Sequence, residues 1–207
     1  MAMKVLLVNG SPNKRGCTYT ALAEVAGELE KSGIETEIFH VGKTVQGCTA
    51  CKACRKLGRC VTEDLVNKFA QLAQNADGFV FGSPTYFAGP SGQICSFMDR
   101  LFFAHGRSLR LKPACAVVSA RRGGTTANLD RLNKYFAWAQ MPVISSVYWN
   151  MVHGNTPDEV AQDHEGLQTM RILGSNMAYM LKCIDAGEKS GVQQPEQPEK
   201  IWTSFVR

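Results

Sequence analysis

Short runs of consecutive apolar residues, separated by stretches with helical spacing, constrain the fold of this chain most strongly. A run without polar alternation is typical of a strand that is buried on both faces of a parallel sheet. Between these runs, apolar residues recur three and four positions apart, as on one face of an amphipathic helix. We assign four such runs to strands, 5–8, 78–82, 114–118 and 143–147, together with the less regular segment 34–41.

The order of these segments predicts an α/β protein. Regular alternation of strand and helix with short links requires right-handed crossovers, which place helices on both faces of a parallel sheet. Five parallel strands predict a flavodoxin-like three-layer sandwich with the strand order 2-1-3-4-5. The helices are expected around residues 22–29, 65–72 and 129–136, and from the capping sequence at 156–159 to about Cys183.

Composition excludes several classes of protein. The chain has 207 residues, of which 44% are hydrophobic and 20% are charged, as expected for a globular domain. The net charge of +5 is modest, and no run of Lys and Arg with interleaved aromatics predicts a nucleic-acid interface. No segment has the length of a membrane span or of a signal peptide. Eight cysteines without an export signal predict a cytoplasmic protein, because reducing compartments keep thiols free.

The C-terminal segment differs in composition from the rest. We expect one domain over residues 1–186 and a polar tail over 187–207, which contains Pro195 and Pro198. Such tails are usually disordered. The alternative is that the terminal apolar residues anchor on the body or on a second subunit. These residues are Ile201, Trp202, Phe205 and Val206.

The turn after the first strand has the features of a phosphate site. In open α/β sheets, ligands bind where strands end and helix N-termini offer unpaired N–H groups. Glycines permit a tight backbone here, while hydroxyl, amide and cationic side chains suit a phosphate monoester. The turn is neither a Walker loop nor a G-x-G-x-x-G turn, and the simpler alternative is an ordinary capped βα turn. The candidate residues are Ser11, Asn13, Arg15, Gly16, Cys17 and Thr18.

Three loops carry a resemblance to a known family. Residues 10–18 resemble the G-S-P-R-x-x-G-x-T loop of the NADPH-dependent FMN reductases, with Asn13 in place of the arginine. Residues 82–87 match the family's G-S-P-x-Y loop, and 119–125 match the loop that faces the pyrimidine edge of the flavin. The resemblance covers residues 3–185 and implies that FMN is the cofactor. It adds to the expected FMN contacts Pro84, Thr85, Tyr86, Phe87, Ser119, Arg121, Arg122, Gly123 and Gly124.

Four cysteines form a compact motif, C-x2-C-x2-C-x5-C, at Cys48, Cys51, Cys54 and Cys60. This spacing can offer four thiolates to a 4Fe-4S cluster, with the turn at Gly58 returning the chain to the last of them. Structural zinc more often uses two separated pairs, and free thiols or a redox disulfide remain open. The motif resembles iron-sulfur flavoproteins, a related branch in which these positions bind a 4Fe-4S cluster.

The resemblance implies an FMN-dependent NAD(P)H oxidoreductase. NAD(P)H would pass a hydride to flavin N5, and electrons would continue to an unidentified acceptor such as a quinone, a flavin or a protein. FMN carries the chemistry, so no catalytic side chain is expected. The alternative is an iron-sulfur flavoprotein that carries electrons from ferredoxin by FMN and a 4Fe-4S cluster. A third alternative is an FMN-binding module that regulates a partner. The resemblance also implies a homodimer or homotetramer.

Overall fold

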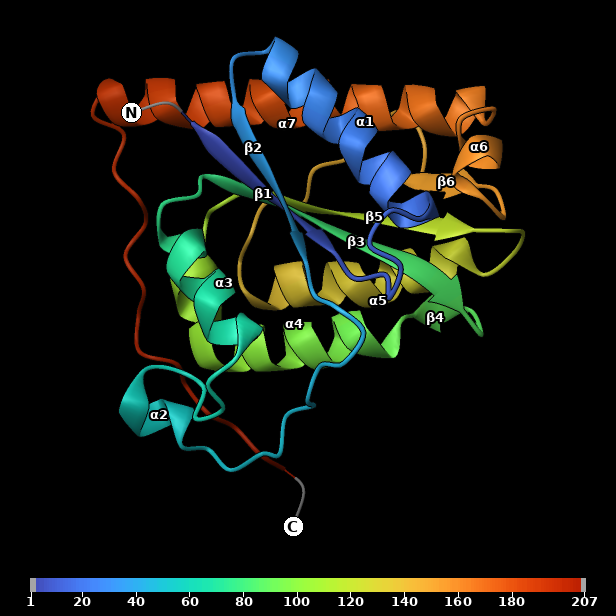
Figure 1. The fold of residues 1–207 in the computed structure, drawn as a ribbon. Helices are drawn as coiled ribbons and strands as arrows, with labels where there is room; N and C mark the ends of the chain where they lie inside the picture. The colour runs from blue at the N-terminus through green and yellow to red at the C-terminus, as the bar shows by residue number, and fades with distance from the viewer. Residues whose placement is uncertain (1–2, 206–207) are drawn as a thin grey trace.

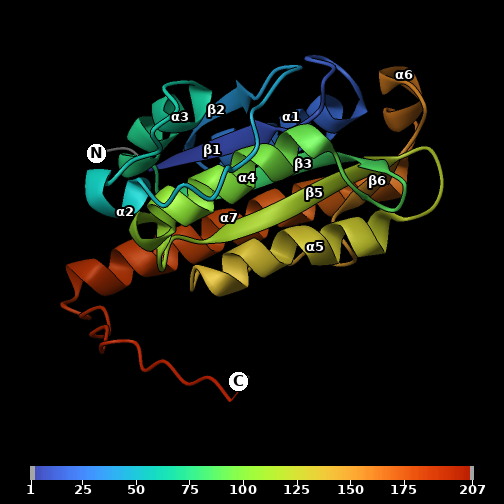
Figure 2. The same cartoon turned by 90° about the horizontal axis from the view of Figure 1, so that it is seen from below.

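A twisted parallel sheet forms the middle layer of the molecule (Figures 1 and 2). The computed structural model describes residues 3–205. Five strands follow the order β2-β1-β3-β5-β6, and β4 (Gly89–Pro90) pairs antiparallel with the end of β3. This confirms the predicted flavodoxin-like order. The strands are β1 (Lys4–Asn9), β2 (Glu35–His40), β3 (Gly78–Tyr86), β5 (Ala114–Ala120) and β6 (Met151–His153).

Helices cover both faces of this sheet. Successive residues of a strand point to opposite faces, so Leu6 packs in one core and Leu7 in the other. Because both cores are apolar, the central strands read as continuous hydrophobic runs. On one face lie α1 (Cys17–Lys31) and α7 (His164–Lys189); on the other lie α3 (Leu65–Gln74), α4 (Gly92–His105) and α5 (Thr125–Trp138).

The sequence analysis did not predict α4. Its buried side chains nevertheless follow the three- and four-residue spacing of an amphipathic helix, as Ile94, Phe97, Met98 and Leu101 show. Ser91 caps its N-terminus by accepting a hydrogen bond from Ile94 N at 3.2 Å. Three short helical turns complete the fold: α2 (Cys54–Leu57), η1 (Gly106–Leu109) and α6 (Pro157–Val160).

The predicted fifth strand at 143–147 is wrong. The last strand is β6, and the earlier segment meets the sheet only through a bridge between Ala114 and Val143. The hydroxyl of Ser146 donates to Tyr148 O at 2.7 Å and lies 2.7 Å from Asn150 Oδ1. Such local side-chain bonds compete with a strand ladder, and the chain therefore bends before it rejoins the sheet.

The predicted bounds of the last helix are also wrong. The cap at Thr156 opens only the single turn of α6, and α7 begins anew at His164. Asp163 caps this second start by accepting from Gly166 N at 3.0 Å. Because α7 continues to Lys189, the expected tail boundary at 186 falls inside its last turn.

The tail has no helix or strand between residues 190 and 205. Arg110 Nη2 donates to Pro195 O at 3.0 Å and fixes its first part. Ile201, Trp202 and Phe205 are at least 80% exposed, so they do not pack on the body, and anchoring on a second subunit stays a prediction. Val206 lies outside the described residues. None of the helices between residues 3 and 205 is long and apolar enough to cross a membrane.

Candidate functional site

The loop between β1 and α1 is shaped by its own polar side chains. Ser11 N donates to Asn9 Oδ1 at 3.0 Å, and Asn9 Nδ2 donates to Lys14 O at 3.1 Å. Asn13 N donates to Ser11 Oγ at 3.1 Å. The side chain of Asn9, which the sequence analysis did not single out, therefore holds the loop in a closed turn.

The N-terminus of α1 fits an anion. Gly16 is the N-cap residue, and no side chain caps the helix or places an acidic group in its first turn. The first N–H groups of a 15-residue helix consequently lack intrahelical acceptors and carry the positive end of the helix dipole. A phosphate satisfies both conditions, so the predicted phosphate site is physically reasonable here.

A buried pair of hydroxyls joins the first and third loops. Thr18 Oγ1 lies 2.8 Å from Ser119 Oγ, and both side chains are almost fully buried. One hydroxyl hydrogen is used between them, and the other remains available as a donor. The sheet register explains this meeting, because β1, β3 and β5 are adjacent and end at the same edge.

Ser91 supports the loop between β1 and α1. Its hydroxyl donates to Gly10 O at 2.7 Å, and its N–H donates to Ser83 Oγ at 3.0 Å. Gly10 must be glycine because an added Cβ would lie 2.5 Å from Ile94 Cβ. Ser91 thus ties the N-terminus of α4 to the ends of β1 and β3. The sequence signal that could have revealed it is a serine just before an amphipathic stretch.

The second and third loops touch each other. Asn128 Nδ2 donates to Pro84 O at 3.1 Å and to Thr85 Oγ1 at 2.9 Å. Gly124 adopts a left-handed conformation with φ of +93°, and an added Cβ would lie 2.8 Å from Ala88 Cα. The backbone of both loops is therefore held in one place. The sequence analysis missed Asn128, whose signal is an amide on the buried face of α5.

The aromatic residues of the second loop project from this edge. Tyr86 is 45% exposed and Phe87 is fully exposed. Phe87 and its neighbour Ala88 have φ values of 50° and 58°, a strained conformation for residues other than glycine. Strain of this kind clusters at ligand sites, and the exposed rings offer a flat apolar surface to a planar ligand.

The predicted FMN residues thus fall into three groups. Buried at the sheet edge are Ser11, Thr18 and Ser119; partly buried are Gly16, Cys17, Pro84, Thr85 and Gly124; exposed are Asn13, Arg15, Tyr86, Phe87, Arg121, Arg122 and Gly123. Cys17 faces the loop that follows β6, since its Sγ lies 3.7 Å from Gly154 O. Burial raises the pKa of its thiol, so Cys17 stays neutral and suits packing better than phosphate binding.

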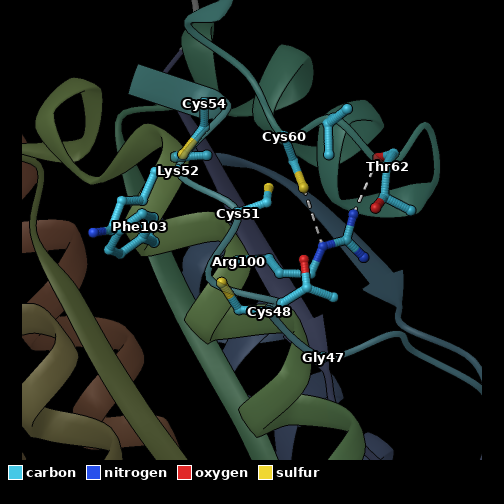
Figure 3. Close-up of a pocket in the computed structure, with 12 residues that line it drawn as sticks. Gly47, Cys48, Cys51, Lys52, Cys54, Cys60, Thr62, Arg100 and Phe103 are labelled. Atoms are coloured by element: carbon cyan, nitrogen blue, oxygen red, sulfur yellow. Dashed lines mark hydrogen bonds between the residues drawn. The ribbon is translucent and has the colours of Figure 1, made fainter. Parts of the chain in front are cut away.

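The four motif cysteines line one hollow beside α4 (Figure 3). Cys48 and Cys51 lie in an exposed coil, Cys54 begins α2, and Gly58 ends it in a left-handed conformation that returns the chain to Cys60. Hydrogen bonds from the Ala53 backbone and the Thr49 side chain lower the pKa of the Cys51 thiol. A lower pKa favours the thiolate, which is the form that binds metal.

Within residues 3–205, no three His, Cys, Asp or Glu side chains lie close enough to share a single metal ion. That geometry does not match a mononuclear zinc site. A cubane cluster binds each thiolate at a different iron, so its ligands need to surround a volume rather than a point. All four motif cysteines line one hollow, and this shared lining is the feature that a cluster site would need.

The cysteine motif lies in a positively charged stretch of the sequence. No Asp or Glu occurs between residues 43 and 62. Arg59 is paired with Glu63, whereas Lys52, Arg55 and Lys56 are exposed on the loop. These cations oppose the negative charge of several thiolates and lower the cost of holding them together.

Helix α4 links the two sites. Ser91, its N-cap, bonds to Gly10 in the predicted phosphate loop, and Arg100 bonds to Cys60 in the cysteine hollow. Nine residues separate them, which corresponds to about 13 Å along a helix axis. The segment 43–46, which leads into the cysteine loop (residues 47–62), runs beside α4 over this distance. Gln93 donates to Lys43 O, and Arg100 donates to Gln46 O.

Residues 3–156 match the family model of the NADPH-dependent FMN reductases. The chain belongs to this family. Membership confirms the predicted family and its FMN cofactor, and agrees with the predicted class of oxidoreductase.

Relatives of this chain include iron-sulfur flavoproteins. One from Methanocaldococcus jannaschii is 32% identical and covers 88% of this chain and 99% of its own length. Another, from Archaeoglobus fulgidus, is 34% identical and covers 90% and 96%. Among solved structures, RosB with a bound riboflavin phosphate derivative matches with a TM-score of 0.71 at 15% identity. That match covers 100% of this chain and 94% of RosB, and it supports the fold alone.

Proposed function

We propose that this FMN reductase family member is a two-centre redox protein, with FMN at the carboxyl edge of the sheet and a 4Fe-4S cluster on the cysteine loop. The observation that carries the proposal is the convergence of Cys48, Cys51, Cys54 and Cys60 on one hollow. Two relatives that match this chain over nearly their whole length are named iron-sulfur flavoproteins, and these names support the same proposal.

The chain's own groups would bind and orient FMN. The free N–H groups at the start of α1 and the hydroxyls of Ser11 and Thr18 would hold the phosphate. The backbone around Gly124 would meet the edge of the flavin, and the rings of Tyr86 and Phe87 would exclude water from one side. When bound, FMN supplies the exchange between two-electron and one-electron redox chemistry.

NAD(P)H oxidation is the second candidate, favoured by the match to a family of NADPH-dependent reductases. In that case NAD(P)H is the donor, and the acceptor is a quinone, a flavin or a protein. For the two-centre redox protein, the donor is a one-electron carrier such as ferredoxin.

For both candidate functions, we propose a cytoplasmic location, which suits eight cysteines without a disulfide among those described. We also propose a homodimer or homotetramer, which would cover the exposed rings of Tyr148 and Trp149.

A cysteine substitution tests the cluster. Cys54→Ser is compared with Cys183→Ser, because Cys183 is exposed on α7, away from the hollow. After anaerobic purification, Cys54→Ser should keep FMN and lose the iron and the broad absorption of the cluster, whereas Cys183→Ser should keep both. Equal iron in both variants would refute the assignment of the loop.

A reduction assay then separates the two candidate donors. The FMN-loaded wild type is mixed anaerobically with NADPH, NADH or reduced ferredoxin, and flavin bleaching is followed. Rapid bleaching by a nicotinamide supports the oxidoreductase, whereas bleaching by ferredoxin alone supports the electron carrier. Slow bleaching with every donor would contradict both.

A further inference from the structure

Among the residues that the structure describes, Arg100 is a buried charged residue without a predicted chemical role. It lies on α4 with its side chain only 2% exposed, and it reaches the floor of the cysteine hollow (Figure 3). A buried guanidinium is costly unless all of its donors are paired. Its pairing therefore indicates what the residue holds in place.

Each of the five N–H groups of Arg100 has its own acceptor. Nε donates to Cys60 Sγ at 3.3 Å. Nη1 and Nη2 donate to the two carboxylate oxygens of Asp64 at 2.6 and 2.9 Å. Nη1 also donates to Gln46 O at 3.3 Å, and Nη2 to Thr62 O at 3.1 Å. A guanidinium has five donors in a fixed fork, so no donor is left over.

The two backbone acceptors of Arg100 lie on either side of the cysteine motif in the sequence. Gln46 precedes the first motif cysteine by two residues, and Thr62 follows the last by two. The guanidinium thus joins the two arms of the loop at its base. Asp64, in turn, caps α3 by accepting from Val66 N at 3.0 Å, which connects the fork to the body of the fold.

Cys60 is held more firmly than the other three cysteines. Asn67 on α3 accepts from Cys60 N at 3.1 Å and donates to Cys60 O at 2.9 Å. Arg100 adds a bond to the sulfur itself. By contrast, Cys48 and Cys51 are exposed and lie in coil.

We propose that Arg100 is a positioning residue that closes the cysteine loop and fixes Cys60 as the preformed corner of the cluster site. Only the effect of Arg100 on the reduction potential rests on the proposed cluster. A hydrogen bond donated to a cluster thiolate stabilises the reduced, more negative state and raises the reduction potential. Arg100 therefore acts on both the geometry and the potential of the site.

The test combines Arg100→Lys with a matched control, Arg171→Lys, whose arginine pairs with Glu24 on the opposite face of the sheet. A lysine has three donors on one nitrogen, so it cannot reproduce the fork that pairs both Asp64 oxygens while a separate nitrogen reaches Cys60. In iron-free protein, alkylation of each cysteine by iodoacetamide is timed by mass spectrometry. In iron-loaded protein, the midpoint potentials of cluster and FMN are measured by redox titration.

In iron-free wild type, Cys60 should be alkylated about tenfold more slowly than Cys48, because Cys60 is partly buried with its sulfur against Arg100, whereas Cys48 is exposed. Arg100→Lys should remove most of this difference, and Arg171→Lys should not. In loaded protein, Arg100→Lys should lower the cluster potential by about 59 mV, a tenfold change for one electron. The FMN potential should stay unchanged.

A role in folding alone would lower Tm in Arg100→Lys without changing the alkylation ratio or the cluster potential, and that result overturns the proposal. Equal alkylation of Cys60 and Cys48 in wild type also overturns it, and this measurement needs no variant. Because it uses iron-free protein, it decides the role of Arg100 even if the wild type binds no iron. Absence of iron would instead refute the proposed cluster.

Discussion

Replacing Ser91 with alanine should destabilise the fold at the point where the phosphate loop meets α4. The variant loses the N-cap bond to Ile94 N, which typically contributes about 1 kcal/mol. It also leaves the buried carbonyl of Gly10 without its 2.7 Å donor, at a cost of about 1–3 kcal/mol. We therefore expect the free energy of unfolding to fall by about 2–4 kcal/mol.

Urea denaturation of the FMN-free protein, followed by far-UV circular dichroism, measures this loss. The midpoint should fall by about 1 M, since m is about 2–3 kcal/mol/M for a domain of this size. The control is Thr156→Ala, which removes an exposed cap from the single turn of α6 and should cost no more than about 1 kcal/mol. A Ser91→Ala variant within about 0.5 kcal/mol of wild type would refute the reasoning.

Three further predictions concern the site. Gly124→Ala should weaken FMN binding, because Gly124 has a φ of +93° and an added Cβ would lie 2.8 Å from Ala88 Cα, which forces the third loop to move. Fluorescence titration with FMN should give a Kd raised by about tenfold or more. An unchanged Kd would contradict the placement of this loop. Thr18→Val and Ser119→Ala should be non-additive in the free energy of unfolding by about 0.5–1.5 kcal/mol, because they remove the same 2.8 Å hydrogen bond; strict additivity would show that the pair is not formed. In native iron-free protein at pH 8, iodoacetamide should modify Cys51 early and Cys115 last, because hydrogen bonds lower the pKa of the first thiol and full burial raises that of the second; equal rates would contradict the core placement of Cys115.

Much of the fold could be predicted because its central strands are buried on both faces. The runs at 5–8, 78–82 and 114–118 lie within β1, β3 and β5, and their continuity is a direct consequence of the two cores. By contrast, β6 has three residues at the edge of the sheet, too few to form a recognisable pattern. The apolar run at 143–147 was therefore mistaken for it.

The candidate site could be predicted only where its residues are close in sequence. The phosphate loop and the cysteine motif are local, and their spacing carries the signal. Ser91 bonds to Gly10, 81 residues away, and Arg100 bonds to acceptors 36 to 54 residues away. Such contacts arise from the packing of α4 between two loops, and no local pattern encodes them.

The content of iron, acid-labile sulfide and FMN in anaerobically purified wild-type protein decides whether the chain carries both FMN and a cluster on the cysteine loop. We expect about four iron and four sulfide per FMN, as for one 4Fe-4S cluster. Protein that holds a full complement of FMN with neither iron nor sulfide, even after anaerobic reconstitution with both, would contradict it.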